Sequence, residues 1–78
     1  MYKVLILGVN GFIGTHFQEY IVKYKLTEDY NFIGVDREIE KKGPLSYWEV
    51  DLNAPGVTET LIEDVSPDYI MNIAGVFE

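Results

Sequence analysis

Three glycines in one short turn constrain the fold of this chain more than any other feature. Gly8, Gly11 and Gly14 follow an apolar run at residues 3–7, whose Val, Leu and Ile side chains are typical of a strand buried in a parallel sheet. The apolar residues that come next have the spacing of an amphipathic helix over residues 12–24. They are Ile13, Phe17, Tyr20, Ile21 and Tyr24. A strand, a glycine-rich turn and a helix in this order predict the first unit of a parallel α/β fold.

The rest of the chain continues the alternation. Further apolar runs predict three more strands, at residues 32–35, 47–50 and 69–74. Apolar residues four apart predict a second helix; they are Val57, Leu61 and Val65. Asn53 and Pro55 indicate its start, and Ser66 and Pro67 its end. The order β-α-β-β-α-β predicts a parallel sheet of the doubly wound type, with right-handed crossovers and strand order 3-2-1-4.

The connection between the second and third strands is short for such a sheet. Residues 37–45 join them, whereas a parallel crossover usually needs about a dozen residues or more. We expect an irregular crossover without a full helix. The alternative is an antiparallel hairpin, which would put Asp36 and Asp51 at opposite ends of the sheet.

The glycine turn has the chemistry of an anion site. The first N–H groups of a helix have no acceptor within it, and the helix dipole adds about half a positive charge there. Gly8 would permit the tight turn, Gly11 the close approach of a pyrophosphate, and Gly14 the close packing of helix on strand. The spacing is G-x-x-G-x-x-G, and no Gly-Lys-Ser/Thr follows, which excludes a Walker A loop. The alternative is that the glycines serve helix–sheet packing alone.

Asp36 ends the second strand, 22 residues past Gly14. A carboxylate at this place accepts hydrogen bonds from the adenosine ribose of a dinucleotide and repels a 2′-phosphate, so NAD is favoured over NADP. Arg37 beside it can hold a 2′-phosphate, which leaves NADP open. The alternative for Asp36 is a solvated carboxylate at a strand end.

Taken together, these motifs resemble the N-terminal part of the NAD-dependent epimerase/dehydratase family, the extended short-chain dehydrogenases/reductases. The resemblance rests on LILGVNGFIG at 5–14, VD at 35–36, VDL at 50–52 and PDYIMNIAG at 67–75, and it covers essentially the whole chain. It implies a Rossmann-type fold. We expect residues 1–78 to be the truncated N-terminal part of a dinucleotide-binding domain.

The resemblance also implies how the cofactor binds. The three glycines bracket the pyrophosphate, and the backbone of Phe12 and Ile13 donates to it. Asp51 accepts from the exocyclic amine of adenine, with Leu52 alongside, and two residues after the fourth strand line the cleft. With Arg37, the candidate cofactor-binding residues are Gly8, Gly11, Phe12, Ile13, Gly14, Asp36, Arg37, Asp51, Leu52, Ala74 and Gly75.

The catalytic residues of the family do not occur in this sequence. Its members use a Tyr followed four residues later by Lys, and none of the six tyrosines here has Lys at that spacing. We therefore expect the catalytic Tyr and Lys to lie outside the chain. For the whole enzyme the resemblance implies hydride transfer between a nucleotide sugar and the nicotinamide, and commonly a homodimer. Two alternatives remain open: a stand-alone module that binds NAD or an adenine nucleotide, and a purely structural domain.

Two departures leave the subfamily open. Leu7 stands where many members have Thr before the first glycine. Residues 72–75 read Asn-Ile-Ala-Gly, where extended members often have His-Leu-Ala-Ala.

Charge and composition exclude several other classes of protein. The formal net charge is −7, and residues 43–78 carry seven acids without a Lys or Arg, which argues against binding to nucleic acid. This acidic half is either a solvated face or faces a basic surface of a partner or of further sequence. The chain has no cysteine, and His16 is its single histidine, so no metal site is predicted. We expect Tyr47 and Trp48 to pack within their strand.

The sequence shows no signal for membrane insertion or secretion. No apolar run approaches the roughly 18 residues that a spanning helix needs, and the N-terminus lacks the pattern of a leader peptide. We therefore expect a cytoplasmic protein without membrane contact.

Overall fold

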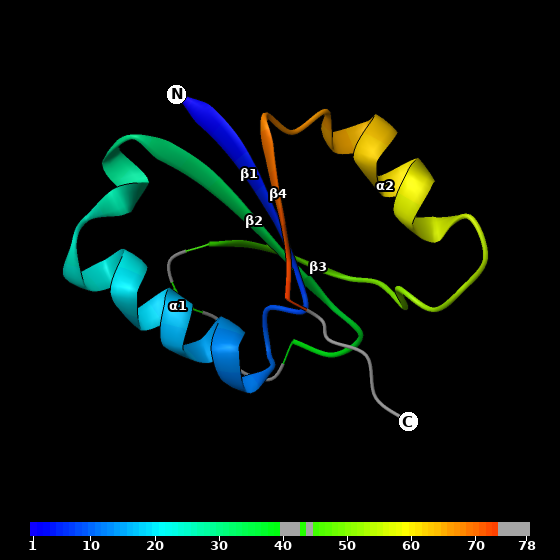
Figure 1. Cartoon of the computed structure of the whole chain (residues 1–78), viewed down its shortest axis with the longest axis horizontal. Helices are drawn as coiled ribbons and strands as arrows, with labels where there is room; N and C mark the ends of the chain where they lie inside the picture. The colour runs from blue at the N-terminus through cyan, green and yellow to red at the C-terminus, as the bar shows by residue number, and fades with distance from the viewer. Residues whose placement is uncertain (40–42, 44, 74–78) are drawn as a thin grey trace.

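The computed structural model describes residues 1–39, 43 and 45–73, which form a sheet with a helix on either side (Figure 1). In chain order the elements are β1 (Tyr2–Leu7), α1 (Phe12–Lys23), the short 3₁₀ helix η1 (Leu26–Glu28), β2 (Tyr30–Asp36), β3 (Ser46–Glu49), α2 (Val57–Val65) and β4 (Tyr69–Asn72). The predicted order of strands and helices is confirmed.

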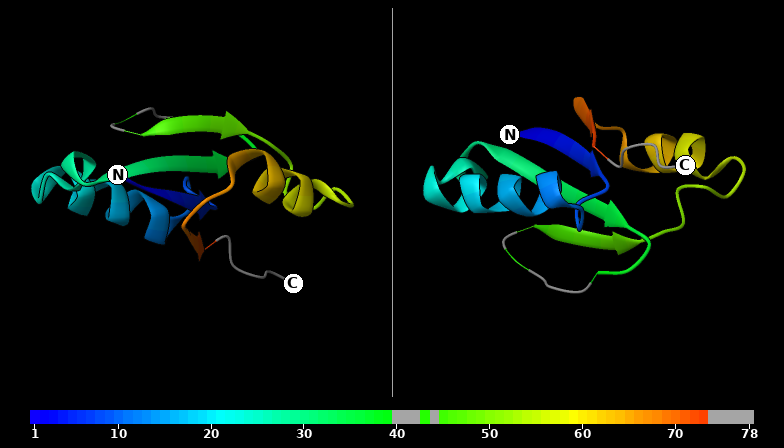
Figure 2. Two further views of the ribbon diagram at one scale, coloured as in Figure 1. Left: turned by 90° about the horizontal axis from the view of Figure 1, so that it is seen from above. Right: turned by 60° about the horizontal axis from the view of Figure 1, so that its bottom comes forward.

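The four strands are all parallel and lie in the order β3-β2-β1-β4. The left view of Figure 2 shows them in this order, from β3 on one side to β4 on the other. The short connection between β2 and β3 is therefore a parallel crossover, and the hairpin alternative is wrong. Leu7 is paired with Val35 and with Asn72, and Asp36 with Glu49, so the carboxyl ends of the strands share one edge.

Alternation of side chains along the buried strands divides the core between the two helices. One face carries Leu5, Leu7, Ile33 and Val35 against Leu61 and Val65 of α2. On the other face, Val4, Ile6 and Phe32 pack against Val9 of the turn and Ile21 of α1. Strands β1 and β2 are thus covered on both faces, as a parallel sheet requires.

Helix α1 lies in the predicted place but is turned differently from the prediction. Its buried residues are Gly14 and Ile21, whereas Ile13, Tyr20 and Tyr24 are exposed. The predicted apolar stripe is wrong for these three residues. The reason is Gly14, which lets the helix pack closely against the turn. Ile21 lies seven residues further on, about two helical turns, and is therefore on the same face of the helix as Gly14. This face meets the sheet.

Helix α2 begins later than its sequence signals indicate. The predicted Asn53 cap is wrong, because the helix starts at Val57 after Gly56, whose φ of 77° is left-handed, and no side chain caps it. The N–H of Asn53 instead donates to Oδ1 of Asp51, at 3.0 Å, in a turn before the helix. The predicted stop is confirmed, since the helix ends at Val65 and Ser66 adopts a φ of 51°.

Two other boundaries also differ from the sequence prediction. Strand β2 begins at Tyr30, two residues before the predicted start at residue 32, and η1 precedes it. Strand β4 ends at Asn72, and the predicted end at residue 74 lies outside the described residues. In the described part of the chain, no helix is long and apolar enough to cross a membrane.

Candidate functional site

The glycine turn lies at the carboxyl edge of the sheet and is tied to β2. The N–H groups of Gly8 and Val9 both donate to the carbonyl oxygen of Val35, at 2.8 and 3.1 Å. Gly8 has a φ of 92°, a left-handed conformation that glycine adopts without steric cost. After β1, the chain therefore turns beside the end of β2, to which it is hydrogen-bonded, and then enters α1.

Gly11 and Gly14 have different physical roles in this turn. A Cβ at Gly14 would lie 2.3 Å from the carbonyl oxygen of Val9 and 2.8 Å from that of Gly8, so the packing of the chain itself requires glycine. Among the described residues, a Cβ at Gly11 would meet only the oxygen of Gly8, at 3.6 Å, which is an ordinary contact. The chain's own packing leaves space above Gly11, and that space suits the close approach of a ligand.

The N-terminus of α1 presents free hydrogen-bond donors beside that space. Gly11 is the N-cap residue and no side chain caps the helix. The first helical bond runs from the N–H of Thr15 to Gly11, at 2.9 Å, and the N–H groups of Phe12 and Ile13 have no acceptor among the described residues. Unpaired donors at a helix N-terminus attract an anion such as a pyrophosphate.

Asp36 is joined directly to the glycine turn. Its Oδ2 accepts from the N–H of Asn10 and its Oδ1 from the N–H of Arg37, both at 2.8 Å. The side chain of Asn10 in turn donates to the carbonyl of Glu38. Each carboxylate oxygen can accept a further hydrogen bond. Asp36 thus holds the turn in place and still has capacity for ribose hydroxyls.

The structure brings some of the other predicted residues to the same edge. The N–H of Val50 donates to the carbonyl of Asp36, at 2.8 Å, which places Asp51 and Leu52 just beyond the end of β3. Asp51 is exposed, and Leu52 is half-buried against the core under α2. Arg37 is exposed beside Asp36. Ala74 and Gly75 lie outside the described residues.

A comparison with protein-family models gives one match. The NAD dependent epimerase/dehydratase family matches residues 4–78, nearly the whole chain. The chain belongs to this family. No curated protein sequence matches it. The epimerase/dehydratase family is typically enzymatic and NAD(P)-dependent, which agrees with the class of cofactor predicted from the glycine turn and Asp36.

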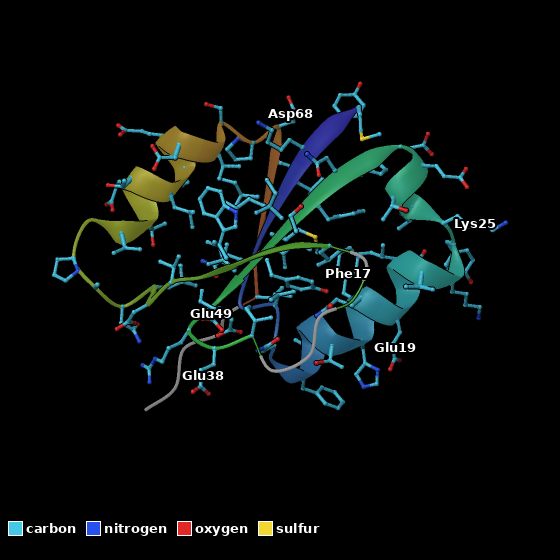
Figure 3. All side chains as sticks on the ribbon, turned by 180° about the vertical axis from the view of Figure 1, so that it is seen from behind. Phe17, Glu19, Lys25, Glu38, Glu49 and Asp68 are labelled. Carbon is cyan, nitrogen blue, oxygen red and sulfur yellow. The ribbon has the colours of Figure 1, made fainter. Side chains whose placement is uncertain are left out.

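This epimerase/dehydratase chain also uses two residues that sequence reasoning missed. Gln18 of α1 donates to the carbonyl of Val9, at 2.9 Å, and accepts from the hydroxyl of Tyr47 on β3, at 2.7 Å. Gly34 of β2 leaves room for the fully buried Val9, because a Cβ there would lie 2.9 Å from Cγ2 of Val9. Figure 3 shows the side chains from behind, with the neighbouring Phe17 of α1 pointing toward the sheet.

Gln18 carries no sequence signal for this role, and the signal at Gly34 is a general one. A glutamine on a helix and a glycine in a strand are common, and their partners are distant in sequence. The signal that could have drawn attention to Gly34 is its place inside an apolar strand, where a glycine indicates close backbone or side-chain approach. Within the described residues, no three His, Asp or Glu side chains gather as metal ligands.

Proposed function

We propose that this chain binds NAD as the cofactor-binding segment of an oxidoreductase that acts on nucleotide sugars. The observation that carries the proposal is the hydrogen bond from Asn10 in the glycine turn to Asp36, at 2.8 Å. It joins an anion-binding turn to a carboxylate at the carboxyl edge of a doubly wound sheet, where ligands of such folds bind. Membership of the epimerase/dehydratase family supports the class of reaction.

The residues present fit a dinucleotide. The N–H groups of Phe12 and Ile13 would hold the pyrophosphate, and the open space above Gly11 would admit it. Asp36 would accept from the adenosine ribose, and Asp51 would accept from the adenine amine. The nicotinamide supplies hydride transfer when the cofactor is bound. What these residues contribute is binding and orientation.

Further parts of the proposal rest on the family alone. The sequence contains no Tyr-x-x-x-Lys, so the proton-transferring Tyr and its Lys would be supplied from outside these 78 residues. The nucleotide-sugar substrate and a homodimeric enzyme follow from the same resemblance. The same glycine turn and Asp36 would also serve a second candidate function, a stand-alone module that binds NAD or an adenine nucleotide without catalysis.

Replacement of Asp36 by alanine tests the preference for NAD. We expect Asp36→Ala to weaken NAD binding about tenfold or more, since charge-assisted hydrogen bonds contribute about 1.5–3 kcal/mol. The variant also removes the hydrogen bond that Asp36 accepts from Asn10 of the turn, which weakens the binding of both cofactors. The informative quantity is therefore the dissociation constant of NADP divided by that of NAD. This ratio should fall, because the charge that repels a 2′-phosphate is gone. Calorimetric titration with each cofactor measures it.

Glu38→Ala is the matched control, because Glu38 is exposed, carries the same charge as Asp36 and contacts Asn10 through its backbone carbonyl. It should leave NAD affinity unchanged. An equal loss of both cofactors in Asp36→Ala would show that Asp36 serves the turn alone and does not bind the ribose.

A further inference from the structure

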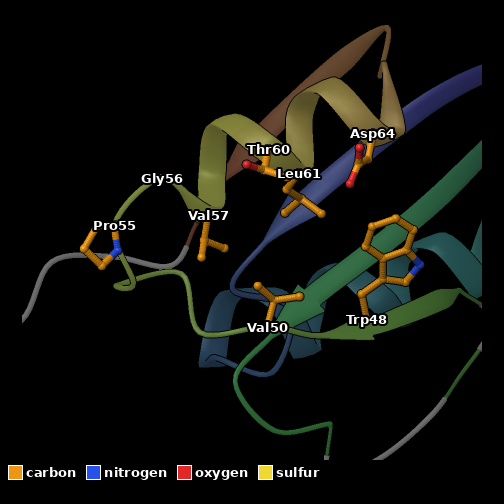
Figure 4. Close-up of a pocket in the computed structure, with 8 residues that line it drawn as sticks. All are labelled: Trp48, Val50, Pro55, Gly56, Val57, Thr60, Leu61 and Asp64. Carbon is orange, nitrogen blue, oxygen red and sulfur yellow. The ribbon is translucent and has the colours of Figure 1, made fainter.

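A second concave surface lies on the flank of the sheet, away from the glycine turn. It is a hollow of about 340 Å³ between β3 and α2 (Figure 4). The residues that line it are Trp48, Val50, Pro55, Gly56, Val57, Thr60, Leu61 and Asp64. None of these belongs to the candidate cofactor residues, so the hollow needs an explanation of its own.

The hollow combines an apolar floor with a carboxylate and an indole ring. Val50, Val57 and Leu61 supply aliphatic surface. In Figure 4 the carboxylate of Asp64, from α2, points toward the ring of Trp48, from β3. The expectation that Trp48 packs within its strand is only partly met, because the side chain is 39% exposed.

This combination matches the chemistry of an arginine side chain. A guanidinium is attracted to the face of a tryptophan ring and pairs with a carboxylate through parallel hydrogen bonds. Its aliphatic stem prefers apolar surface. Lysine offers the same charge, but its ammonium is compact and strongly hydrated and does not stack on a ring as a planar guanidinium does.

The part of the chain that lines the hollow supplies no cation of its own. Residues 43–78 supply seven acids and no Lys or Arg. Among the described residues, no Lys or Arg forms an ion pair, and Lys3 uses its Nζ to donate to the carbonyl of Val65, at 2.7 Å. A symmetric contact of this face with a second copy would place two acidic surfaces against each other, which like-charge repulsion disfavours.

We propose that the hollow between β3 and α2 docks an arginine side chain from a basic segment of a partner protein. The guanidinium lies between the ring of Trp48 and the carboxylate of Asp64, and its stem lies on Val50 and Leu61. None of the lining residues is a candidate cofactor residue, and the proposal does not depend on the proposed oxidoreductase function.

The single tryptophan of the chain makes the test direct, because its fluorescence reports on the hollow alone. The 78-residue chain is titrated with a capped Gly-Arg-Gly peptide, and with Gly-Lys-Gly and Gly-Leu-Gly as comparison peptides. We expect a saturable change with the arginine peptide at roughly millimolar concentration, a weaker one with lysine and none with leucine. Added salt should weaken the arginine complex. Equal binding of the leucine peptide would overturn the proposal.

Substitutions on α2 then separate a specific contact from general charge. Asp64→Asn should lower the affinity for the arginine peptide about threefold to fivefold, the range expected for a partly exposed ion pair. Asp64→Glu keeps the charge and should retain most of the affinity. Glu63→Gln removes the same charge from an exposed neighbour that does not line the hollow, and it should bind as the unsubstituted chain does. Unchanged binding in Asp64→Asn, or an equal loss in Glu63→Gln, would contradict the assignment.

Discussion

Replacement of Gly14 by alanine is expected to lower the free energy of unfolding by about 3 kcal/mol or more. The added Cβ would lie 2.3 Å from the carbonyl oxygen of Val9 and 2.8 Å from that of Gly8. Both atoms belong to the backbone of the turn, which is tied to Val35, so relief requires the helix or the turn to move. Overpacking typically costs about 1–3 kcal/mol, and a contact this short with backbone belongs at the upper end. Urea denaturation followed by circular dichroism measures the loss.

Gly11→Ala is the matched control for this prediction. Gly11 has an extended backbone with φ at −70°, and within the part of the chain that the structure describes a Cβ there makes a single contact, with the oxygen of Gly8 at 3.6 Å. The expected loss is below about 1 kcal/mol, the scale of a change at a helix N-cap. Equal losses in the two variants would mean that helix α1 does not pack against the turn as the structure has it.

Gly11→Val is expected to weaken NAD binding about a hundredfold while the chain still folds. The extended backbone at Gly11 accommodates a β-branched side chain. That side chain would fill the space through which a pyrophosphate reaches the N–H groups of Phe12 and Ile13. A steric cost near the top of the roughly 1–3 kcal/mol expected for overpacking corresponds to about a hundredfold loss of affinity. Calorimetric titration with NAD gives the affinity, and circular dichroism confirms the fold.

The pair of glycine substitutions separates folding from binding. Gly14→Ala should lose stability, whereas Gly11→Val should lose affinity. An unchanged affinity in Gly11→Val would mean that the turn does not bind a phosphate, and the assignment of the cofactor site would then be wrong.

Strand order and the position of the site could be predicted because both follow from local patterns. Runs of β-branched residues predicted the strands, and the glycine turn with Asp36 at the next strand end predicted a shared carboxyl edge. The short connection at 37–45 left the direction of the third strand open between a parallel crossover and an antiparallel hairpin. The register of Asp36 against Glu49 in parallel strands resolves it.

Other features could not be predicted because they depend on contacts between distant residues. The periodicity of α1 fits two adjacent faces, and only the contact of Gly14 with Val9 selects the one that is buried. The hydrogen bond between Asn10 and Asp36 joins residues 26 apart in the chain. A sequence pattern reports which side chains suit an element, but it does not report which distant backbone donor a carboxylate will meet.

The start of α2 illustrates a competition between signals. Asn53 and Pro55 are typical of a helix start, yet the N–H of Asn53 is taken by the side chain of Asp51. The same carboxylate is a candidate partner of adenine. A local turn therefore fixes Asp51 near the end of β3, and the cap of the helix is Gly56, three residues later than the predicted Asn53 cap.

The most direct test of the cofactor site is a titration of the ¹⁵N-labelled chain with NAD, followed by the backbone amide signals. We predict saturable shifts that are largest for Asn10, Gly11, Phe12, Ile13 and Asp36, with the indole signal of Trp48 unchanged. Shifts that are confined to other parts of the chain, or no saturable shift in the glycine turn, would contradict the assignment of this turn and Asp36 as the dinucleotide site.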